Sequence, residues 1–313
     1  MNDYVTRIHL KTQGKHREDL IDFCLHHREK QYLAIGWSYV YLDENKEVQI
    51  NDFTKYKEYY NAVKKSVNRI NPALNVFEDA KPNDLFWTRD LNGYYWICRV
   101  KSKAESYFDA DKDIGAVLPV EAYQFGLEVP GQIKASFNRP RGGTVHKINK
   151  KKIIEYSKFI FNKLSKKQYY EVNVNIEKNE DNWLDNLPDF DLEELIISYL
   201  QIAKDYYVLS NSIANKSTTI KIECELFSRN VNKREKAVVQ VKGGDDIEIN
   251  PKVYEEYIKK GYVVYLYAPK ITHIEGLKVE RINPKDIEEF YKEYESILPE
   301  SITKWKNLFC DIE

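Results

Sequence analysis

Long apolar runs and Cys-x-x-Cys pairs are missing from this sequence of 313 residues, and its net charge is only −1. The longest unbroken run of apolar and aromatic residues extends from Tyr262 to Ala268, whereas a membrane-spanning helix needs about 20 such residues. The first fifteen residues also lack the apolar core of a secretory signal peptide. These absences predict a protein that neither enters a membrane nor is secreted.

The four cysteines are widely spaced and form no Cys-x-x-Cys pair. A structural zinc site or a disulfide framework is therefore not expected, and a cytoplasmic location fits. The 48 basic residues balance 49 acidic ones, so only local clustering can create a site for a polyanion. A chain of this length buries enough surface to fold into two domains without covalent staples.

The first half mixes helical and strand patterns. Apolar spacing predicts helices over Arg17–Lys30 and Asp52–Ile70, and a hairpin formed by Leu85–Arg89 and Tyr94–Val100. Further strands are expected over 32–41, 116–120 and 129–137. These elements predict an α+β domain over residues 1–170.

A basic stretch ends this domain. Between Arg139 and Tyr169 there are ten Lys or Arg residues and one acidic residue, Glu155. The cations that we expect to contact DNA phosphates are Arg139, Arg141, Lys150, Lys151 and Lys152. The alternative is a solvated helix face without a partner. The polar segment 171–188 is expected to be a linker, which leaves residues 189–313 as the second domain.

The second domain alternates elements in the order αβββαβ, which predicts an α/β sheet flanked by helices. The helices are expected over 191–204 and 251–260, and the strands over 206–210, 218–227, 236–242 and 263–267. Strand side chains alternate, so Glu223 and Glu225 share one face, as do Gln240 and Lys242. If the two strands pair, a carboxylate, an amide and an ammonium group meet at the end of the sheet.

Such a set suits metal-assisted hydrolysis of a phosphodiester. Glu223, Gln240 and the carbonyl of Val241 would hold Mg²⁺ through oxygen atoms, and Lys242 would offset developing charge. Glu223 is preferred as the metal ligand because an apolar strand leads into it, and Glu225 remains the alternative acid.

These residues resemble the Mrr-like branch of the PD-(D/E)XK restriction endonucleases, in which Gln replaces the second acid, as in Gln240-Val241-Lys242. The family also places a Glu in the preceding helix, and Leu192-Glu193-Glu194-Leu195-Ile196 matches that phrase. The resemblance covers about 191–269 and implies catalytic roles for Glu193, Glu223, Gln240 and Lys242. It departs at the first acid, where the family usually has Asp. The alternative is a solvated strand face without catalytic function, because a Gln-x-Lys pair is common on such strands.

The first domain weakly resembles the EVE-type domains of the PUA-like superfamily, which implies a β-barrel with helices that reads a modified base. The motifs are Gly36-Trp37, Asn83-Asp84 before Trp87, and a hairpin containing Trp96. A base taken out of the stack needs aromatic faces and polar groups. Trp37, Trp87 and Trp96 are the expected faces, with Tyr95 as a further ring, and Asp90 and Asn92 are the expected edge readers. The alternative is that these rings pack a barrel core.

The sequence therefore predicts a modification-dependent DNA endonuclease of the type IV restriction kind. It would act with Mg²⁺ on double-stranded DNA, with modified cytosine as one candidate base. Because each chain would carry one active site and two strands must be cut, a homodimer is a reasonable expectation. The alternative is a non-catalytic nucleic-acid-binding protein with a PUA-like reader and a degenerate nuclease fold.

Overall fold

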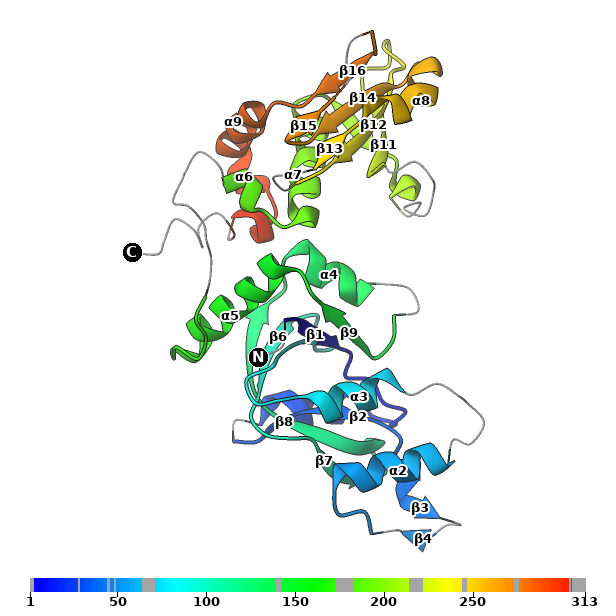
Figure 1. The fold of residues 1–313 in the computed structure, drawn as a ribbon, viewed down its shortest axis with the longest axis vertical. Coiled ribbons are helices and arrows are strands. Elements are labelled where there is room, and N and C mark those ends of the chain that lie inside the picture. Colours follow the sequence, from blue (N-terminus) through cyan, green and yellow to red (C-terminus); the bar gives the residue numbers. More distant parts are fainter. Residues whose placement is uncertain are drawn as a thin grey trace. The chain divides into compact units, whose positions relative to one another are not determined.

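The protein is a mixed α/β protein (Figure 1). A computed structural model describes residues 3–27, 29–43, 46–47, 49–63, 71–138, 142–172, 183–213, 222–243, 247–272, 276–303 and 305. These residues form two compact units. Unit 1 comprises those within Met1–Val129 and Ile133–Val174, and unit 2 those within Pro130–Gln132 and Asn175–Glu313. None of the described helices has both the length and the apolar composition needed to cross a membrane.

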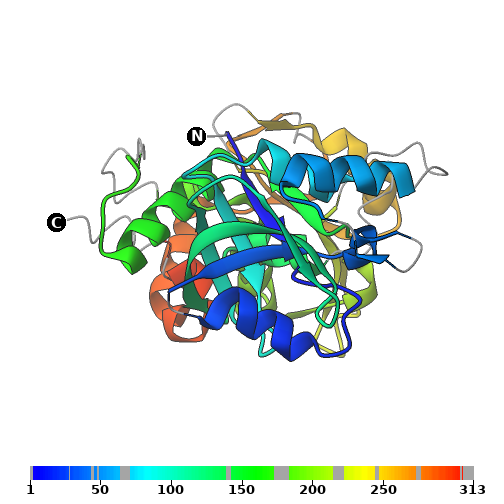
Figure 2. The same ribbon diagram turned by 90° about the horizontal axis from the view of Figure 1, so that it is seen from below.

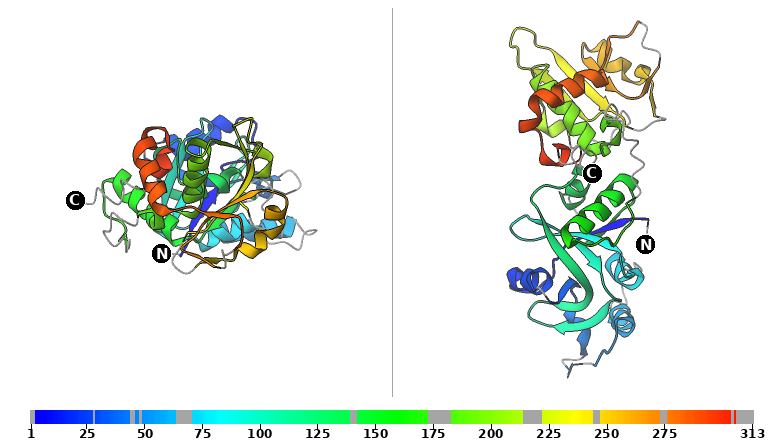
Figure 3. Two further views of the ribbon diagram at one scale, coloured as in Figure 1. Left: turned by 90° about the horizontal axis from the view of Figure 1, so that it is seen from above. Right: turned by 90° about the vertical axis from the view of Figure 1, so that its left-hand side faces the viewer.

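Unit 1 is built on a seven-stranded sheet that curls into a half-barrel (Figure 3). The strand order is β2-β8-β6-β5-β1-β9, with β7 paired to β8. The strands β1 and β5 are parallel, and the other pairs are antiparallel. The bounds are β1 Val5–Ile8, β2 Gln31–Ile35, β5 Leu85–Arg89, β6 Tyr95–Val100, β7 Glu105–Asp109, β8 Ile114–Gly126 and β9 Val145–Ile148.

Helices cover both faces of this sheet (Figure 2). One face is buried by α1 (Arg17–Ile21), the π-helical turn Asp22–His26, α2 (Phe53–Val63) and α3 (Pro72–Asp79). The other face carries α5 (Lys151–Ser165), whose buried residues recur at helical spacing, and α4 (Gly131–Asn138). A short 3-10 helix (Ser38–Tyr41) and a two-stranded ribbon, β3 (Leu42–Asp43) with β4 (Lys46–Glu47), complete the unit.

Several expected elements of unit 1 differ from the observed ones. The strand expected over 129–137 is wrong, because Ile133, Ser136 and Phe137 form the buried face of helix α4 at helical spacing. The strand expected to reach Tyr41 ends at Ile35, and the helix expected over 17–30 ends at His26 through a π-helical turn. Helix α3 was not expected, although Asn71 caps it and Pro72 starts it. The expected helix residues 64–70 lie outside the described residues.

Unit 2 contains a five-stranded sheet in the order β10-β11-β12-β14-β16. The first three strands are antiparallel, and β12, β14 and β16 are parallel. The bounds are β10 Tyr206–Val208, β11 Cys224–Ser228, β12 Lys236–Val241, β14 Val263–Tyr267 and β16 Val279–Arg281. A second, two-stranded sheet pairs β13 (Glu248–Ile249) with β15 (Lys270–Ile271).

Helices cover this sheet as well. The helix α7 (Asp189–Ile202) packs against β12, and α8 (Glu255–Lys259), preceded by a 3-10 turn (Pro251–Tyr254), packs against β14. The helix α9 (Pro284–Tyr294) packs against α7 and is followed by a 3-10 turn (Glu295–Ile297). Another 3-10 turn (Ser210–Ser212) follows β10. The expected helices and strands occur in the expected order, α7-β10-β11-β12-α8-β14, but β13 was not expected between β12 and α8, and the expected strand residues 218–221 lie outside the described residues.

The segment expected to be a linker contains structure. Helix α6 (Trp183–Asn186) lies within it, and the ring of Trp183 packs edge-on against that of Tyr291 in α9, with centroids 4.6 Å apart. The apolar rings explain the difference, since their burial stabilises unit 2 more than exposure in a linker would.

Candidate active site and nucleic-acid-binding residues

Strand pairing in unit 2 brings the acid and the Gln-x-Lys motif together. The backbone amide of Glu223 donates to the carbonyl of Val239 at 2.8 Å, which extends the β11–β12 ladder by one residue. This register places Glu223 beside Gln240 on one face of the sheet. The Gln240 Nε2 atom donates to Glu223 Oε1 at 2.5 Å, and Lys242 Nζ lies 3.7 Å from the same oxygen.

Burial differs sharply across this cluster. Glu223 is 7% exposed and Gln240 is 2% exposed, whereas the side chain of Lys242 is 33% exposed. The buried pair is therefore shielded from water, and the ammonium group reaches toward solvent, where a large substrate must approach. The hydroxyl of Tyr254 reaches Gln240 Oε1 at 3.5 Å. Burial, and then the charge of Glu223, raise the pKa of Tyr254 to about 12, so this hydroxyl remains protonated.

The amide of Gln240 lies between two oxygens that a metal ion would use. Its Nε2 atom donates to Glu223 Oε1 and also to the carbonyl of Val241 at 3.1 Å. A rotation of this amide by 180° would turn Oε1 toward the same two oxygens and create a three-oxygen site for a hard cation. Among the described residues, no three His, Cys, Asp or Glu side chains gather around one point, so such a site depends on neutral oxygens.

The two other acids expected near this site lie differently. Glu225 is two residues further along the same face, half-buried, and its charge contributes to raising the pKa of Tyr257 after burial. Glu193 is half-buried on α7. Its neighbour Leu192 lies 3.0 Å from the position that a Cβ on Gly243 would take, so this turn of α7 adjoins the residue after Lys242.

The three tryptophans expected to form one aromatic cage are not brought together. Trp87 pairs with Ile97 across the hairpin and Trp96 pairs with Thr88, so the two indoles lie on opposite faces of the sheet. Trp87 is fully buried and its Nε1 donates to Ser157 of α5 at 2.9 Å. The expectation of a single cage is wrong, because strand alternation separates its members.

Trp96 and Asp90 do meet, but in a structural bond. The Trp96 Nε1 atom donates to Asp90 Oδ2 at 2.9 Å, and the backbone amide of Tyr94 donates to Asp90 Oδ1. Asp90 and Trp96 are 8% and 7% exposed, so this pair closes the hairpin from within. Tyr95 is buried on the other face, against Phe137, and Asn92 is exposed in the turn.

Trp37 is held in an unusual backbone conformation. Its φ of 72° lies in the left-handed region, which is rare for a bulky residue. The next residue, Ser38, donates both its amide and its hydroxyl to Asp113 Oδ1 at 2.8 Å, and Tyr56 donates to the carbonyl of Gly36. The half-buried indole lies 5.0 Å from the ring of Tyr60. Backbone strain that neighbours maintain in this way often occurs at functional positions.

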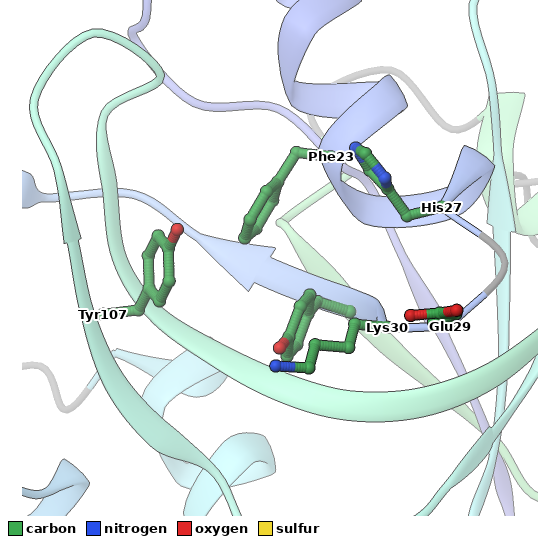
Figure 4. A pocket seen from close by; sticks show the side chains of 6 residues that line it. Phe23, His27, Glu29, Lys30 and Tyr107 are labelled. Carbon is green, nitrogen blue, oxygen red and sulfur yellow. The ribbon is translucent and has the colours of Figure 1, made fainter.

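A pocket of about 460 Å³ opens elsewhere in unit 1 and contains rings that the sequence patterns did not single out (Figure 4). Phe23 and Tyr32 stack at 5.2 Å with an interplanar angle of 10°, and Tyr107 tilts against Phe23 at 5.1 Å. His27, Glu29 and Lys30 complete the lining. These rings come from the π-helical turn, β2 and β7. The three segments are distant in sequence, so no short motif predicts that the rings meet.

The basic residues expected to contact DNA are only partly described. Arg139 and Arg141 lie outside the described residues. Lys150 precedes the first turn of α5, and Lys151 and Lys152 begin it, with the first two exposed and the third half-buried. Positive charge at a helix N-terminus opposes the helix dipole, so these lysines do not stabilise α5.

Comparisons of the chain with protein-family models, with curated proteins and with solved structures found no match.

Proposed function

We propose that this chain is a modification-dependent DNA endonuclease in which unit 2 hydrolyses the phosphodiester and unit 1 recognises the DNA. The observation that carries the proposal is that Gln240 and Lys242 both lie against Oε1 of the buried Glu223 at a strand end. Metal-assisted hydrolysis of a phosphodiester can use a carboxylate, an amide that rotates to present its oxygen, and a partly exposed ammonium group.

Each side chain has a distinct task in this proposal. Glu223, Gln240 and the Val241 carbonyl would hold Mg²⁺, which supplies Lewis-acid activation and lowers the pKa of water when bound. Lys242 reaches the surface from beside Glu223, so its ammonium group offsets the negative charge that develops on the phosphate. Glu223 accepts a hydrogen bond from Gln240 Nε2 and thereby orients the amide. Glu193 would be the acid from the preceding helix, on the α7 turn whose Leu192 lies beside Gly243.

For recognition by unit 1, Trp37 is the member of the expected set whose location favours contact with a base. It is half-buried with a left-handed backbone, and the next residue, Ser38, is bonded to Asp113, whereas Trp87 and Trp96 are buried in the core. The open pocket at Phe23, Tyr32 and Tyr107 is a second location with accessible rings. A base that leaves the stack gains about 1–3 kcal/mol for each aromatic face that it finds.

The decisive experiment compares Glu223→Gln with Glu225→Gln as a matched control on the same strand face. Methylated and unmodified plasmids are incubated with each protein, with and without Mg²⁺. We expect wild type and Glu225→Gln to cut methylated plasmid only with Mg²⁺, and Glu223→Gln to be inactive while still folded. Cutting by Glu223→Gln would overturn the assignment of this site.

The same assay separates the proposal from a non-catalytic binder. A gel-shift measurement on the same plasmids records binding independently of cutting. If wild type binds DNA but never cuts with Mg²⁺ or Mn²⁺, the fold of unit 2 is a scaffold and the endonuclease proposal fails. If it cuts both plasmids equally, the nuclease assignment stands and the reader assignment fails.

A further inference from the structure

A cluster of positively charged side chains surrounds the ring of Phe137 in unit 1. The guanidinium carbons of Arg7 and Arg89 lie 5.8 and 5.6 Å from the centre of this ring, and the imidazole of His9 packs edge-on against it at 5.2 Å. Tyr95 contacts the same ring at 5.4 Å. Phe137 therefore acts as an apolar platform on which three basic groups converge. We call Arg7, His9 and Arg89 the cationic cluster.

Sheet topology explains why these residues meet. The strands β1 and β5 are parallel, with Arg7 beside Trp87, and this register places His9 level with Arg89 two residues later. Side chains two residues apart share a face, so Arg7 and His9 both point to the side that α4 covers with Phe137, and Arg89 lies beside them at the end of β5. The cluster lies where two neighbouring parallel strands end. In open α/β sheets, the carboxyl ends of parallel strands are the usual place for ligands.

Hydrogen bonds hold the two arginines in place. Arg7, which is 1% exposed, donates to the backbone carbonyls of Gly143 and Thr144 at 2.6 and 3.1 Å. The half-buried Arg89 makes two long hydrogen bonds of 3.5 Å, to Tyr95 Oη and Asn138 Oδ1. The carboxylate nearest in sequence, Asp90, accepts hydrogen bonds from Trp96 and Tyr94.

The electrostatic field at His9 has one sign. Burial lowers the pKa of His9 to about 4, and Arg7, Arg89, Arg17 and Lys11 lower it further in the same direction. These four side chains are all cations. An imidazole in such surroundings is neutral at physiological pH, and it keeps an N–H donor that an anion can accept.

Elsewhere in the same unit an arginine is neutralised. The Nε and Nη2 atoms of Arg99 on β6 both donate to Glu121 Oε2 on β8, and its guanidinium stacks on Tyr169 at 3.9 Å. The chain can therefore pair an arginine with an acid when stability alone is served. The cost of gathering like charges around Phe137 is understandable when an external anion completes the cluster.

We propose that Arg7, His9 and Arg89 form an anion site that binds one phosphate group of a nucleic-acid backbone. The anion site rests on the cluster alone, whereas DNA as the source of the phosphate rests on the proposed function. Arg89 supplies the guanidinium face, because it has only neutral partners at long distance in the described contacts. Arginine forks match phosphate oxygens in a bidentate manner.

The first test follows the imidazole of His9 by NMR in the full-length protein between pH 3 and 7. Sodium phosphate is added at constant ionic strength, with sodium chloride as the reference. We expect the His9 titration midpoint to rise by at least about one pH unit with phosphate, because a bound anion stabilises the imidazolium. A His9 midpoint that phosphate leaves unchanged would overturn the anion site, and this readout needs no variant.

The second test compares Arg89→Gln with Arg229→Gln, which removes the same charge from an exposed position in unit 2. Binding of a short unmodified duplex is measured by fluorescence anisotropy at several salt concentrations. We expect Arg89→Gln to weaken binding by about tenfold and to reduce the slope of log K against log salt by about 1, with Arg229→Gln close to wild type. Equal binding by wild type and Arg89→Gln would overturn the assignment to a nucleic-acid phosphate.

The two proposals fail in different ways. If wild type never cuts DNA but phosphate shifts His9 and Arg89→Gln weakens the duplex, the nuclease proposal fails and the anion site stands. If phosphate shifts His9 while DNA binding does not depend on Arg89, the source of the anion is wrong. If wild type cuts DNA while His9 ignores phosphate, the nuclease proposal stands and the anion site fails.

Discussion

The polar cluster of unit 2 (Glu223, Gln240 and Lys242) and the cationic cluster of unit 1 differ in how their charges are compensated. In unit 2, the carboxylate of Glu223 has an amide donor at 2.5 Å and an ammonium group at 3.7 Å. In unit 1, Arg7 and Arg89 flank one phenyl ring, and the four side chains that lower the pKa of His9 are all cations. One cluster is nearly neutral by itself, and the other carries excess positive charge.

This difference indicates what each cluster is suited to bind. A site whose single carboxylate is already paired gains little from a monovalent ion and needs a hard divalent ion that several oxygens can contact. A site with like charges is relieved by any anion, and multiple cations favour a polyanion. Under the proposed function, the unit 2 site would hold a metal ion at the scissile phosphate, and the unit 1 site would bind another phosphate of the same backbone.

The largest expected effect tests the unit 2 side of this comparison. Lys242→Ala removes the ammonium group that lies beside Glu223, and we expect cleavage to fall by about 10²–10³-fold because charge on the phosphate is no longer offset. Duplex binding should change by much less. Lys236→Ala, at the exposed other end of β12, is the control and should cut like wild type. Equal rates for the two variants would remove Lys242 from the site.

The next effect tests whether the neutral amide limits metal binding. Gln240→Glu places a second carboxylate against Glu223, so we expect a lower melting temperature without metal because two buried like charges repel. With Mg²⁺ present, the added charge should strengthen metal binding by about tenfold or more, and the melting temperature should rise more steeply with Mg²⁺ than in wild type. Gln124→Glu adds the same charge at an exposed position and should show neither change. A Mg²⁺ dependence like that of wild type would argue against metal at Gln240.

The unit 2 cluster was accessible from the sequence because its cues are local. Two strands with alternating polar residues, joined closely in the chain, have few ways to pair, so Glu223 was expected beside Gln240. The structure places Glu223, rather than Glu225, in direct contact with Gln240. What the strand patterns did not reveal was the position of the Gln240 amide between two oxygens, which depends on a side-chain rotamer.

The unit 1 sites were less accessible for a physical reason. Alternation separates the two faces of a strand but does not say which face is covered, and α5 buries the face that contains Trp87. The cationic cluster joins β1, β5 and α4, whose contacts depend on a parallel pairing between distant strands. The segment containing Phe137 was also expected to be a strand, so its ring had no expected neighbours.

The smallest expected effect tests the unit 1 side through pH. His9 has a folded-state pKa of about 4, below the value of about 6.5 for an unfolded chain, so between these values the unfolded state binds more protons. The free energy of unfolding therefore falls as the pH is lowered from about 6.5 toward 4. Because His9 is only half-buried, solvent screening reduces this contribution to about 1 kcal/mol.

His9→Gln removes this titration, so the loss of stability between pH 7 and 5 should be smaller in the variant than in wild type. Urea unfolding of both proteins at the two pH values, in chloride, measures the difference. In phosphate buffer of matched ionic strength, a bound anion would raise the pKa of His9 and bring the two proteins closer together. Identical pH dependence in chloride would mean that the positive field at His9 is neutralised in solution, and the contrast between the two clusters would then disappear.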